Sequence, residues 1–201
     1  MSNSIPSKLV FYNSKLKRFL NDIVFEKNYS FSFLENNYPI MKIPKFEERK
    51  LLLIACKDGV KNGILLTKLK FNEDDIEAFQ EFYEINNFKV YCFCPILKIE
   101  KKQFLENVQI IETEYFLVGG FDIDKNEGLI KLYKVIIYDE IKKKEIEFIQ
   151  DIKIETNKNF KGFKEPISSI IQTLKGEMLA ICKDENVFSF SEPDFEKIGN
   201  N

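Results

Sequence analysis

LIACKD at Leu53–Asp58 returns as LAICKD at Leu179–Asp184, and LVGGFD at Leu117–Asp122 fits the same frame more loosely. The three aspartates that end these stretches are separated by 64 and 62 residues. An almost constant interval between apolar runs of one kind indicates a repeated structural unit. The sequence therefore predicts three copies of one supersecondary unit along the chain.

The residues after each aspartate support this prediction. A polar turn follows Asp58, Asp122 and Asp184, and a second run with alternating apolar and polar residues comes after each turn. An apolar run, a polar turn and an alternating run together are typical of a β-hairpin. In the first unit the Asn62–Gly63 pair is the expected turn, because both residue types tolerate a positive φ.

Further strands complete the units. In the second unit we expect four antiparallel strands, near residues 88–97, 109–120, 129–138 and 145–155, the last with strict alternation. A strand over residues 166–172 precedes the third hairpin.

The expected organisation has three parts. Residues 1–50 should hold divergent N-terminal strands, residues 51–192 the repeated β region, and residues 193–201 a flexible C-terminal tail. The expected fold class is mostly β, built from antiparallel four-stranded repeat units.

Residues 72–85 are open to two interpretations. An acidic first turn after Asn72, followed by Ile76, Phe79 and Tyr83 at helical spacing, would suit a short helix. In the repeat scheme the same stretch is the fourth strand of the first unit, because the second unit has a strand there. We favour the strand on that ground.

The composition excludes several kinds of chemistry. The 201 residues are 44% hydrophobic, which suits a large core, and the net charge of −2 supplies no basic field for nucleic acid. The chain has no histidine, which removes Ser-His-Asp and Cys-His catalysis and histidine metal ligation. It also contains no P-loop, G-x-G-x-x-G or G-x-S-x-G motif.

The cysteines and the N-terminus bear on the compartment. Cysteines at positions 56, 92, 94 and 182 are too few and too scattered for a disulfide scaffold, so we expect reduced, buried thiols. The first residues lack the pattern of a signal peptide, and no apolar run approaches the roughly 20 residues that cross a bilayer. These features predict a cytoplasmic protein without a membrane segment.

Two parts of the chain carry a resemblance to a known family. FKEPISSIIQ at residues 163–172 with GEMLAICKDENVFSF at 176–190 resembles the first three strands of a WD-like β-propeller blade. YFLVGG at 115–120 with GLIKLY at 128–133 is similar in style to blades of the large propellers in cleavage-factor and damaged-DNA-binding scaffolds. The Gly-His and Trp-Asp signatures are absent, and the interval exceeds the usual ~40–45 residues. The resemblance implies a propeller or partial propeller that acts as an interaction platform.

The number of units affects the expected partners. Propellers close with about 4–8 blades, whereas this chain holds about three units at the observed interval. Either residues 1–50 supply a divergent blade, or the chain is a fragment, or its open edges pair with another chain. Open sheet edges invite pairing, so a complete chain is expected to self-associate or bind a protein partner.

The loop at Asp122–Gly128 is the one calcium candidate. Asp122, Asp124 and Asn126 place oxygen side chains at positions 1, 3 and 5 of the loop. Gly128 stands at position 7 and Tyr133 at position 12, where an EF-hand has glycine at 6 and a bidentate glutamate at 12. The interpretation we favour is a solvated hairpin turn.

The cysteines offer little to a metal. Cys92 and Cys94 share one face of a strand, and a zinc site without histidine would also need Cys56, Cys182 or carboxylates. Cys56 and Cys182 occupy equivalent positions of different units, which a propeller holds apart. Core thiols are therefore expected, with a Cys92–Cys94 redox pair as a remote alternative.

Charged and aromatic groups at several positions could in principle take part in catalysis or binding. We expect the carboxylate pairs to lie on a solvated strand face, the basic clusters in solvated loops and the aromatic residues in the core. The carboxylate pairs are Glu112 with Glu114 and Glu145 with Glu147, the basic clusters are Lys98, Lys101, Lys102 and Lys142–Lys144, and the aromatic residues are Phe88, Tyr91, Phe116, Tyr133 and Phe163.

No catalytic, cofactor-binding or metal residue is assigned, and no cofactor is expected. The leading hypothesis is a non-catalytic protein-interaction scaffold of β-propeller type. The alternatives are a nucleic-acid-associated subunit of a processing complex and, more remotely, a carboxylate-based hydrolase.

Overall fold

The structure is a computed structural model, and it describes residues 8–9, 12–13, 18–19, 23–24, 30–31, 40–43, 50–71, 76–101, 108–135, 146–152 and 163–191. Within these ranges the regular structure is entirely β, and every strand pair is antiparallel. No helix in the described part of the chain is long and apolar enough to cross a membrane. The strands are β1 (Lys8–Leu9), β2 (Tyr12–Asn13), β3 (Arg18–Phe19), β4 (Ile23–Val24), β5 (Ser30–Phe31), β6 (Ile40–Ile43), β7 (Lys50–Asp58), β8 (Lys61–Phe71), β9 (Ile76–Glu84), β10 (Phe88–Lys101), β11 (Val108–Asp122), β12 (Glu127–Val135), β13 (Ile146–Asp151), β14 (Ile167–Gln172), β15 (Met178–Cys182) and β16 (Val187–Phe190).

Three antiparallel sheets follow one another along the chain. The first contains β7, β8 and β9 in sequence order, with β5 and β6 both paired to β7. The second has the order β10-β11-β12-β13, and the third has the order β14-β15-β16. β1 pairs with β4 and β2 with β3 in two small additional ladders. The expectation of a mostly β chain built from antiparallel sheets is confirmed, although only the second of the three sheets has the expected four strands.

The repeated frame occupies equivalent places in the three sheets. Each copy lies on the strand that leads into a hairpin, namely β7, β11 and β15, and its aspartate stands where that hairpin turns. In the second sheet the observed strands lie within a few residues of the expected ones. The segment with two interpretations forms β9, so the helical alternative for residues 76–84 is wrong.

The prediction that Asn62 and Gly63 form the turn of the first unit is wrong. Asn62 and Gly63 lie inside β8, where they pair with Lys57 and Cys56 of β7. The chain reverses three residues earlier, at Gly59 and Val60, and Gly59 has φ +62°. A two-residue hairpin with positive φ at its first position suits glycine there.

Gly63 is required for a different reason. A Cβ on this residue would lie 2.1 Å from the backbone oxygen of Tyr83 and 2.7 Å from the ring of Phe82, both on β9. Because a backbone oxygen in a sheet has little freedom to move, only glycine allows β8 and β9 to approach this closely.

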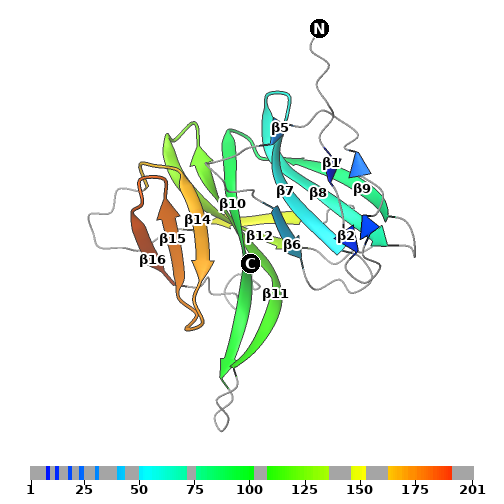
Figure 1. Cartoon of the computed structure of the whole chain (residues 1–201). Coiled ribbons are helices and arrows are strands. Elements are labelled where there is room, and N and C mark those ends of the chain that lie inside the picture. The colour runs from blue at the N-terminus through cyan, green and yellow to red at the C-terminus, as the bar shows by residue number, and fades with distance from the viewer. Residues whose placement is uncertain are drawn as a thin grey trace.

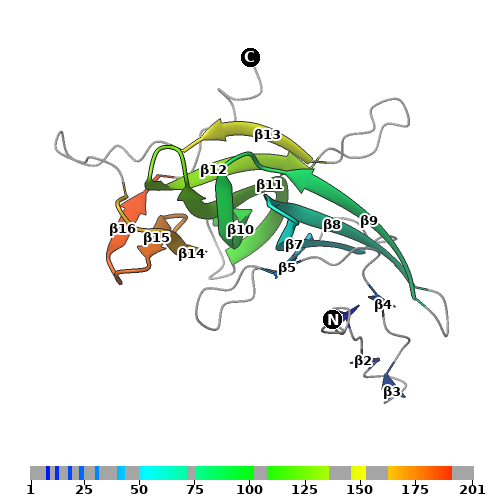
Figure 2. The same ribbon diagram turned by 90° about the horizontal axis from the view of Figure 1, so that it is seen from above.

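The three sheets are stacked face to face, with the second between the first and the third (Figures 1 and 2). Side chains on one face of β11, such as Phe116 and Val118, join the core shared with the first sheet, and Leu117 joins the core shared with the third. A sheet buried on both faces needs apolar residues at successive positions, which explains the continuous apolar run of β11.

The two cores are separate clusters. The first-to-second core is formed by Leu53, Ala55, Ile64, Leu66, Ile85, Phe88, Val90, Phe116, Val118, Tyr133 and Val135. The second-to-third core is formed by Cys92, Cys94, Ile96, Leu117, Ile130, Leu132, Phe163, Ile167, Ile170, Met178, Ala180, Cys182 and Phe190.

One polar clamp also joins the second and third sheets. The pairing of β10 with β11 shifts register between Pro95 and Leu97. The side chain of Gln172 accepts a hydrogen bond from the N–H of Leu97 at 2.7 Å and donates one to its carbonyl oxygen at 2.8 Å. One amide thus satisfies both backbone groups of Leu97 beside the irregularity, as half-buried polar groups require.

Candidate interaction surface

The calcium candidate is a turn held by its own hydrogen bonds. One carboxylate oxygen of Asp122 accepts from the N–H groups of Asp124 at 3.1 Å and Lys125 at 3.0 Å. Asp124 in turn accepts from the side-chain amide of Asn87 at 2.7 Å, and Asn126 has φ +53°. An aspartate that accepts from the next backbone N–H groups is a standard way to stabilise such a turn.

The third copy of the frame uses its aspartate in the same way. Asp184 accepts from the backbone N–H of Asn186 at 3.3 Å and from its side-chain amide. This supplies a physical reason for the repeated aspartate, which is turn formation. Among the residues that the structure describes, no group of three or more His, Cys, Asp or Glu side chains could hold a metal ion.

The four cysteines are buried and unpaired. Burial, with the nearby charge of Asp58 as a smaller contribution, raises the pKa of Cys56 to about 12. Burial raises the pKa of Cys94 to about 11, and it raises that of Cys182 to about 11 together with the charges of Asp184 and Glu165. Burial also raises the pKa of Cys92, which donates a 3.8 Å hydrogen bond from Sγ to the carbonyl oxygen of Ile167. Thiols in this state are poor nucleophiles, so they serve as packing groups.

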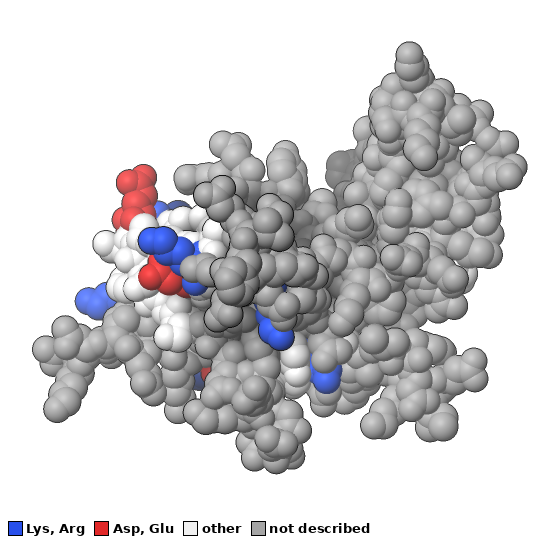
Figure 3. All heavy atoms as spheres, turned by 90° about the horizontal axis from the view of Figure 1, so that it is seen from below, with Lys and Arg blue, Asp and Glu red and all other residues white. Residues whose placement is uncertain are grey.

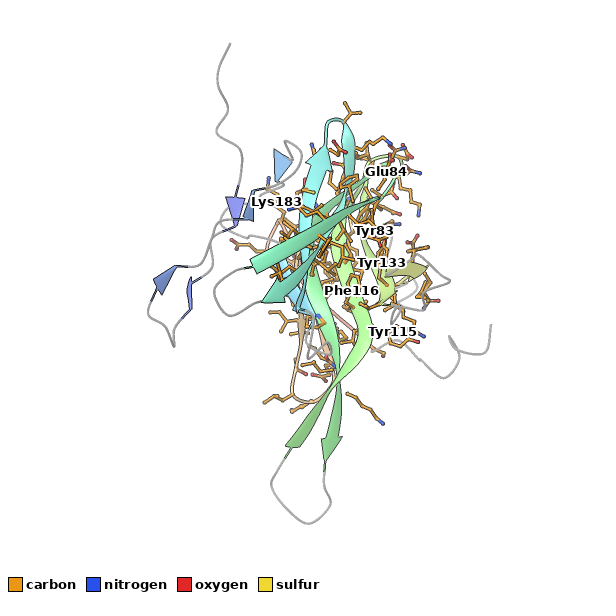
Figure 4. All side chains as sticks on the ribbon, turned by 90° about the vertical axis from the view of Figure 1, so that its right-hand side faces the viewer. Tyr83, Glu84, Tyr115, Phe116, Tyr133 and Lys183 are labelled. Atoms are coloured by element: carbon orange, nitrogen blue, oxygen red, sulfur yellow. The ribbon has the colours of Figure 1, made fainter. Side chains whose placement is uncertain are left out.

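Three of the aromatic candidates belong to the core between the first and second sheets. Phe116 and Tyr133 stack at 5.5 Å between ring centroids, with Phe88 in the same cluster. Figure 4 shows Phe116 and Tyr133 near Tyr83, which packs against that cluster from β9. Burial raises the pKa of Tyr133, with the charge of Asp151 adding to the effect.

The other two aromatic candidates do not join them. Phe163 is buried in the core between the second and third sheets, where its ring centroid lies 5.0 Å from that of Phe188. Tyr91 is half-buried, and burial raises its pKa. The five rings therefore form no single contact patch.

A charged cluster that the sequence did not reveal lies on the second sheet. Lys131 pairs with Asp151 at 2.9 Å and lies 5.0 Å from the ring centroid of Phe88 and 5.2 Å from that of Phe148. Lys125 adds a second ion pair to Asp151 at 3.3 Å. Partial burial alone would raise the pKa of Asp151, but the hydrogen bonds and charges of the two lysines outweigh it and hold this pKa below its ordinary value.

Most of the remaining charged candidates fall outside what is described. Lys102 and Lys142–Glu145 lie outside the described residues, and the side chains of Lys101, Glu112, Glu114 and Glu147 are not described. Lys98 is exposed on β10. On the face shown in Figure 3, the described acidic and basic side chains lie among one another.

The described surface also contains an apolar sheet face, on the side of the third sheet that points away from the second. We call it the outer face. The strand register places two rows on it, one of Ser169, Ile181 and Val187 and one of Ile171, Leu179 and Ser189.

The exposure of this face contrasts with that of the opposite one. Ile171 is 46% exposed and Val187 58% exposed, and Leu179 and Ile181 are half-buried. The alternate residues of the same strands, such as Met178 and Ala180, are fully buried against the second sheet. The repeated frame alone did not indicate this difference, because its third copy is as apolar as the first.

Large apolar side chains such as Phe79 and Phe148 are exposed elsewhere, but the outer face groups Ile171, Leu179, Ile181 and Val187 on three neighbouring strands. A contiguous exposed apolar patch on a protein surface is a candidate interaction site. Comparison of the chain with protein-family models, curated proteins and solved structures gave no match.

Proposed function

We propose that this chain is a non-catalytic protein-interaction module built as an arc of a β-propeller. The observation that carries the proposal is the stacking of three successive antiparallel sheets, each packed on the next by apolar cores. Such serial packing of strand meanders is how propeller blades follow one another. The repeated aspartate-ended frame at equivalent strands of all three sheets adds to the proposal.

The interaction role is supported by what the described side chains do. The Asp122 loop makes turn contacts, the thiols are buried, and the Lys131–Asp151 cluster is held in ion pairs. The outer face brings several exposed or half-buried apolar side chains together on neighbouring strands, and the contacts of the described residues do not account for it. We also place the protein in the cytoplasm, because unpaired thiols suit a reducing compartment.

The test is co-purification of the tagged chain from its source cells, followed by titration calorimetry of the purified chain with each protein recovered. We expect at least one stoichiometric protein complex that survives nuclease treatment and moderate salt. A complex that dissolves with nuclease, or steeply with salt, would assign the chain to nucleic acid instead. Turnover of a substrate by the purified chain, or recovery of no stoichiometric partner, would contradict the proposal.

A further inference from the structure

We infer that the outer face of the third sheet binds the same face of a second copy of this chain, around a two-fold axis that runs along β15. The inference rests on the proposed function, since it takes the chain to be a protein-binding module, and it names one surface and one partner for it.

In the first two sheets, the first residue of the repeated frame lies on the side that packs against the next sheet. This residue is Leu53 in the first sheet, Leu117 in the second and Leu179 in the third. Leu53 packs toward the second sheet and Leu117 toward the third, and both are 0% exposed. Leu179 points to the corresponding side of the third sheet, where the described residues place no further sheet. Leu179 thus has the position at which the first two copies of the frame contact the next sheet, but no described sheet lies against it.

The third position of the frame behaves in the same way. Ala55 belongs to the core toward the second sheet, and a Cβ on Gly119 would lie 2.9 Å from Ile167 in the third sheet. The equivalent residue of the third sheet, Ile181, is half-buried on the outer face. Two frame positions on one strand therefore indicate that a sheet covers this face.

The opposite end of the stack excludes head-to-tail packing of two copies. The face of the first sheet that points away from the second carries Ile54, Cys56 and Leu65, which are 2%, 2% and 0% exposed. Because these residues are covered, the described part of the first sheet offers no open apolar face at this end for the outer face of a second copy. The partner surface available on a second copy is its own outer face, which is the isologous arrangement of a two-fold dimer.

The side chains of the outer face are complementary to themselves in that arrangement. A two-fold axis along β15 places β14 of one copy opposite β16 of the other and leaves each row opposite itself. Ser169 then faces Val187 of the second copy, and Ile171 faces Ser189 of the second copy. Each serine is matched by a large apolar side chain, and Leu179 and Ile181 lie near their own counterparts.

Charge and size decide how strong the contact is. None of the six outer-face residues is charged, so two copies can meet without repulsion between them. Three strands spaced about 4.8 Å apart and about five residues long cover roughly 14 by 16 Å. Since this is smaller than a standard interface, we expect a weak dimer with a dissociation constant on the order of 100 µM, which forms and dissociates with concentration.

The first experiment is light scattering of the full chain from about 1 µM to about 1 mM. We expect the mass to rise from one chain to two across this range. Val187→Lys should raise the dissociation constant at least tenfold, because each dimer would bury two unpaired charges. Phe79→Lys is the matched control, since Phe79 is 60% exposed on a strand of the first sheet, and it should leave dimerisation unchanged. Circular dichroism of each variant reports whether it has folded, and Ser189→Lys replaces Val187→Lys if the latter has not.

The second experiment tests the axis. Ile181→Cys places one thiol of each copy beside the axis, and a short bismaleimide should link it into a covalent dimer. Phe79→Cys should give none, and the native thiols should contribute little because all four are buried.

A chain that stays monomeric throughout overturns the inference, and it leaves binding to other proteins to be decided by co-purification. A dimer that Val187→Lys leaves intact, or a cross-link that forms at position 79 and not at 181, also overturns it. A monomer whose outer face becomes protected only in a complex with another protein would assign the face to that partner and overturn self-association.

Discussion

The second and third sheets contain the same repeated frame in different surroundings. In the second sheet Leu117 is 0% exposed between two sheets, whereas in the third sheet Leu179 is half-buried on an open face. The two strands pair with neighbours in the same antiparallel manner. The difference shows that the frame encodes a strand with two apolar faces, and that covering the second face depends on a neighbouring sheet.

Equivalent residues of the two sheets should therefore differ in how much they contribute to stability and to association. In the second sheet both faces contribute to folding, so substitutions on either face should reduce stability. In the third sheet the face toward the second sheet contributes most to folding of the single chain, because the outer-face side chains are half-buried or exposed. Substitutions on its outer face should leave the folded chain nearly intact and act on association.

The largest expected effect is at the first frame position. Leu117→Ala should lower the free energy of unfolding by about 3 kcal/mol, because it removes buried methyl groups and leaves a cavity. Leu179→Ala should cost about 1 kcal/mol or less in the monomer, since its side chain is only half-buried. Urea unfolding at a concentration where the chain is monomeric measures both. Equal losses would show that Leu117 and Leu179 are covered to the same extent in the monomer.

The next effect concerns the inner face of the third sheet. Burial and the charges of Asp184 and Glu165 raise the pKa of Cys182 to about 11 from an ordinary 9.0. At pH 8 its thiolate fraction should therefore be about a hundredfold smaller than that of an exposed cysteine. Iodoacetamide labelling followed by mass spectrometry should show slow reaction of Cys182 and fast reaction of an Ile181→Cys thiol.

The sign of the accompanying pH effect also follows. A thiol whose pKa is raised by folding contributes stability below its unfolded pKa, and that contribution is lost as the pH rises from about 9 toward about 11. Labelling of native Cys182 at the rate of the introduced thiol would mean that the second sheet does not seal the inner face.

A smaller effect is expected at the clamp between the two sheets. Gln172→Ala removes both hydrogen bonds to the backbone of Leu97 and should lower the free energy of unfolding by about 2 kcal/mol. Gln172→Glu is the sharper control, because a carboxylate can accept from the Leu97 N–H but can no longer donate to its carbonyl oxygen. Thermal unfolding compares the three proteins. If Gln172→Ala is neutral, the apolar core alone holds the third sheet on the second.

The smallest effect belongs to the partly exposed ion pair of the second sheet. Asp151→Asn should cost at most about 1 kcal/mol at neutral pH, because solvent screens such pairs. The pKa of Asp151 is lowered by folding, so its contribution is present above about pH 4 and is lost as the pH falls through the folded value. Urea unfolding from pH 7 to pH 3 should give a shallower decline for Asp151→Asn than for the wild type. If the free energy of unfolding declines equally with pH in both proteins, the ion pair makes no contribution to stability in acid.

The sequence predicted most of the strands and their order. Alternation and apolar runs located β10 to β13, and the match with the second unit favoured a strand over a helix at residues 76–84. The prediction of the first turn was wrong because it relied on the local preference of Asn62 and Gly63. Glycine is required at position 63 because the backbone oxygen of Tyr83, about twenty residues later, leaves no room for a Cβ.

Local pattern by itself determined that this chain forms apolar strands, that they pair in antiparallel order, and that an aspartate ends each repeated run. These properties depend on side-chain periodicity and on hydrogen bonds between near neighbours in sequence. Only the tertiary structure decided which apolar faces are covered. Leu117 and Leu179 look alike in sequence, but a sheet packs on Leu117, whereas the described residues place no sheet on Leu179. Burial is a property of the assembled sheets, so no reading of a single strand can supply it.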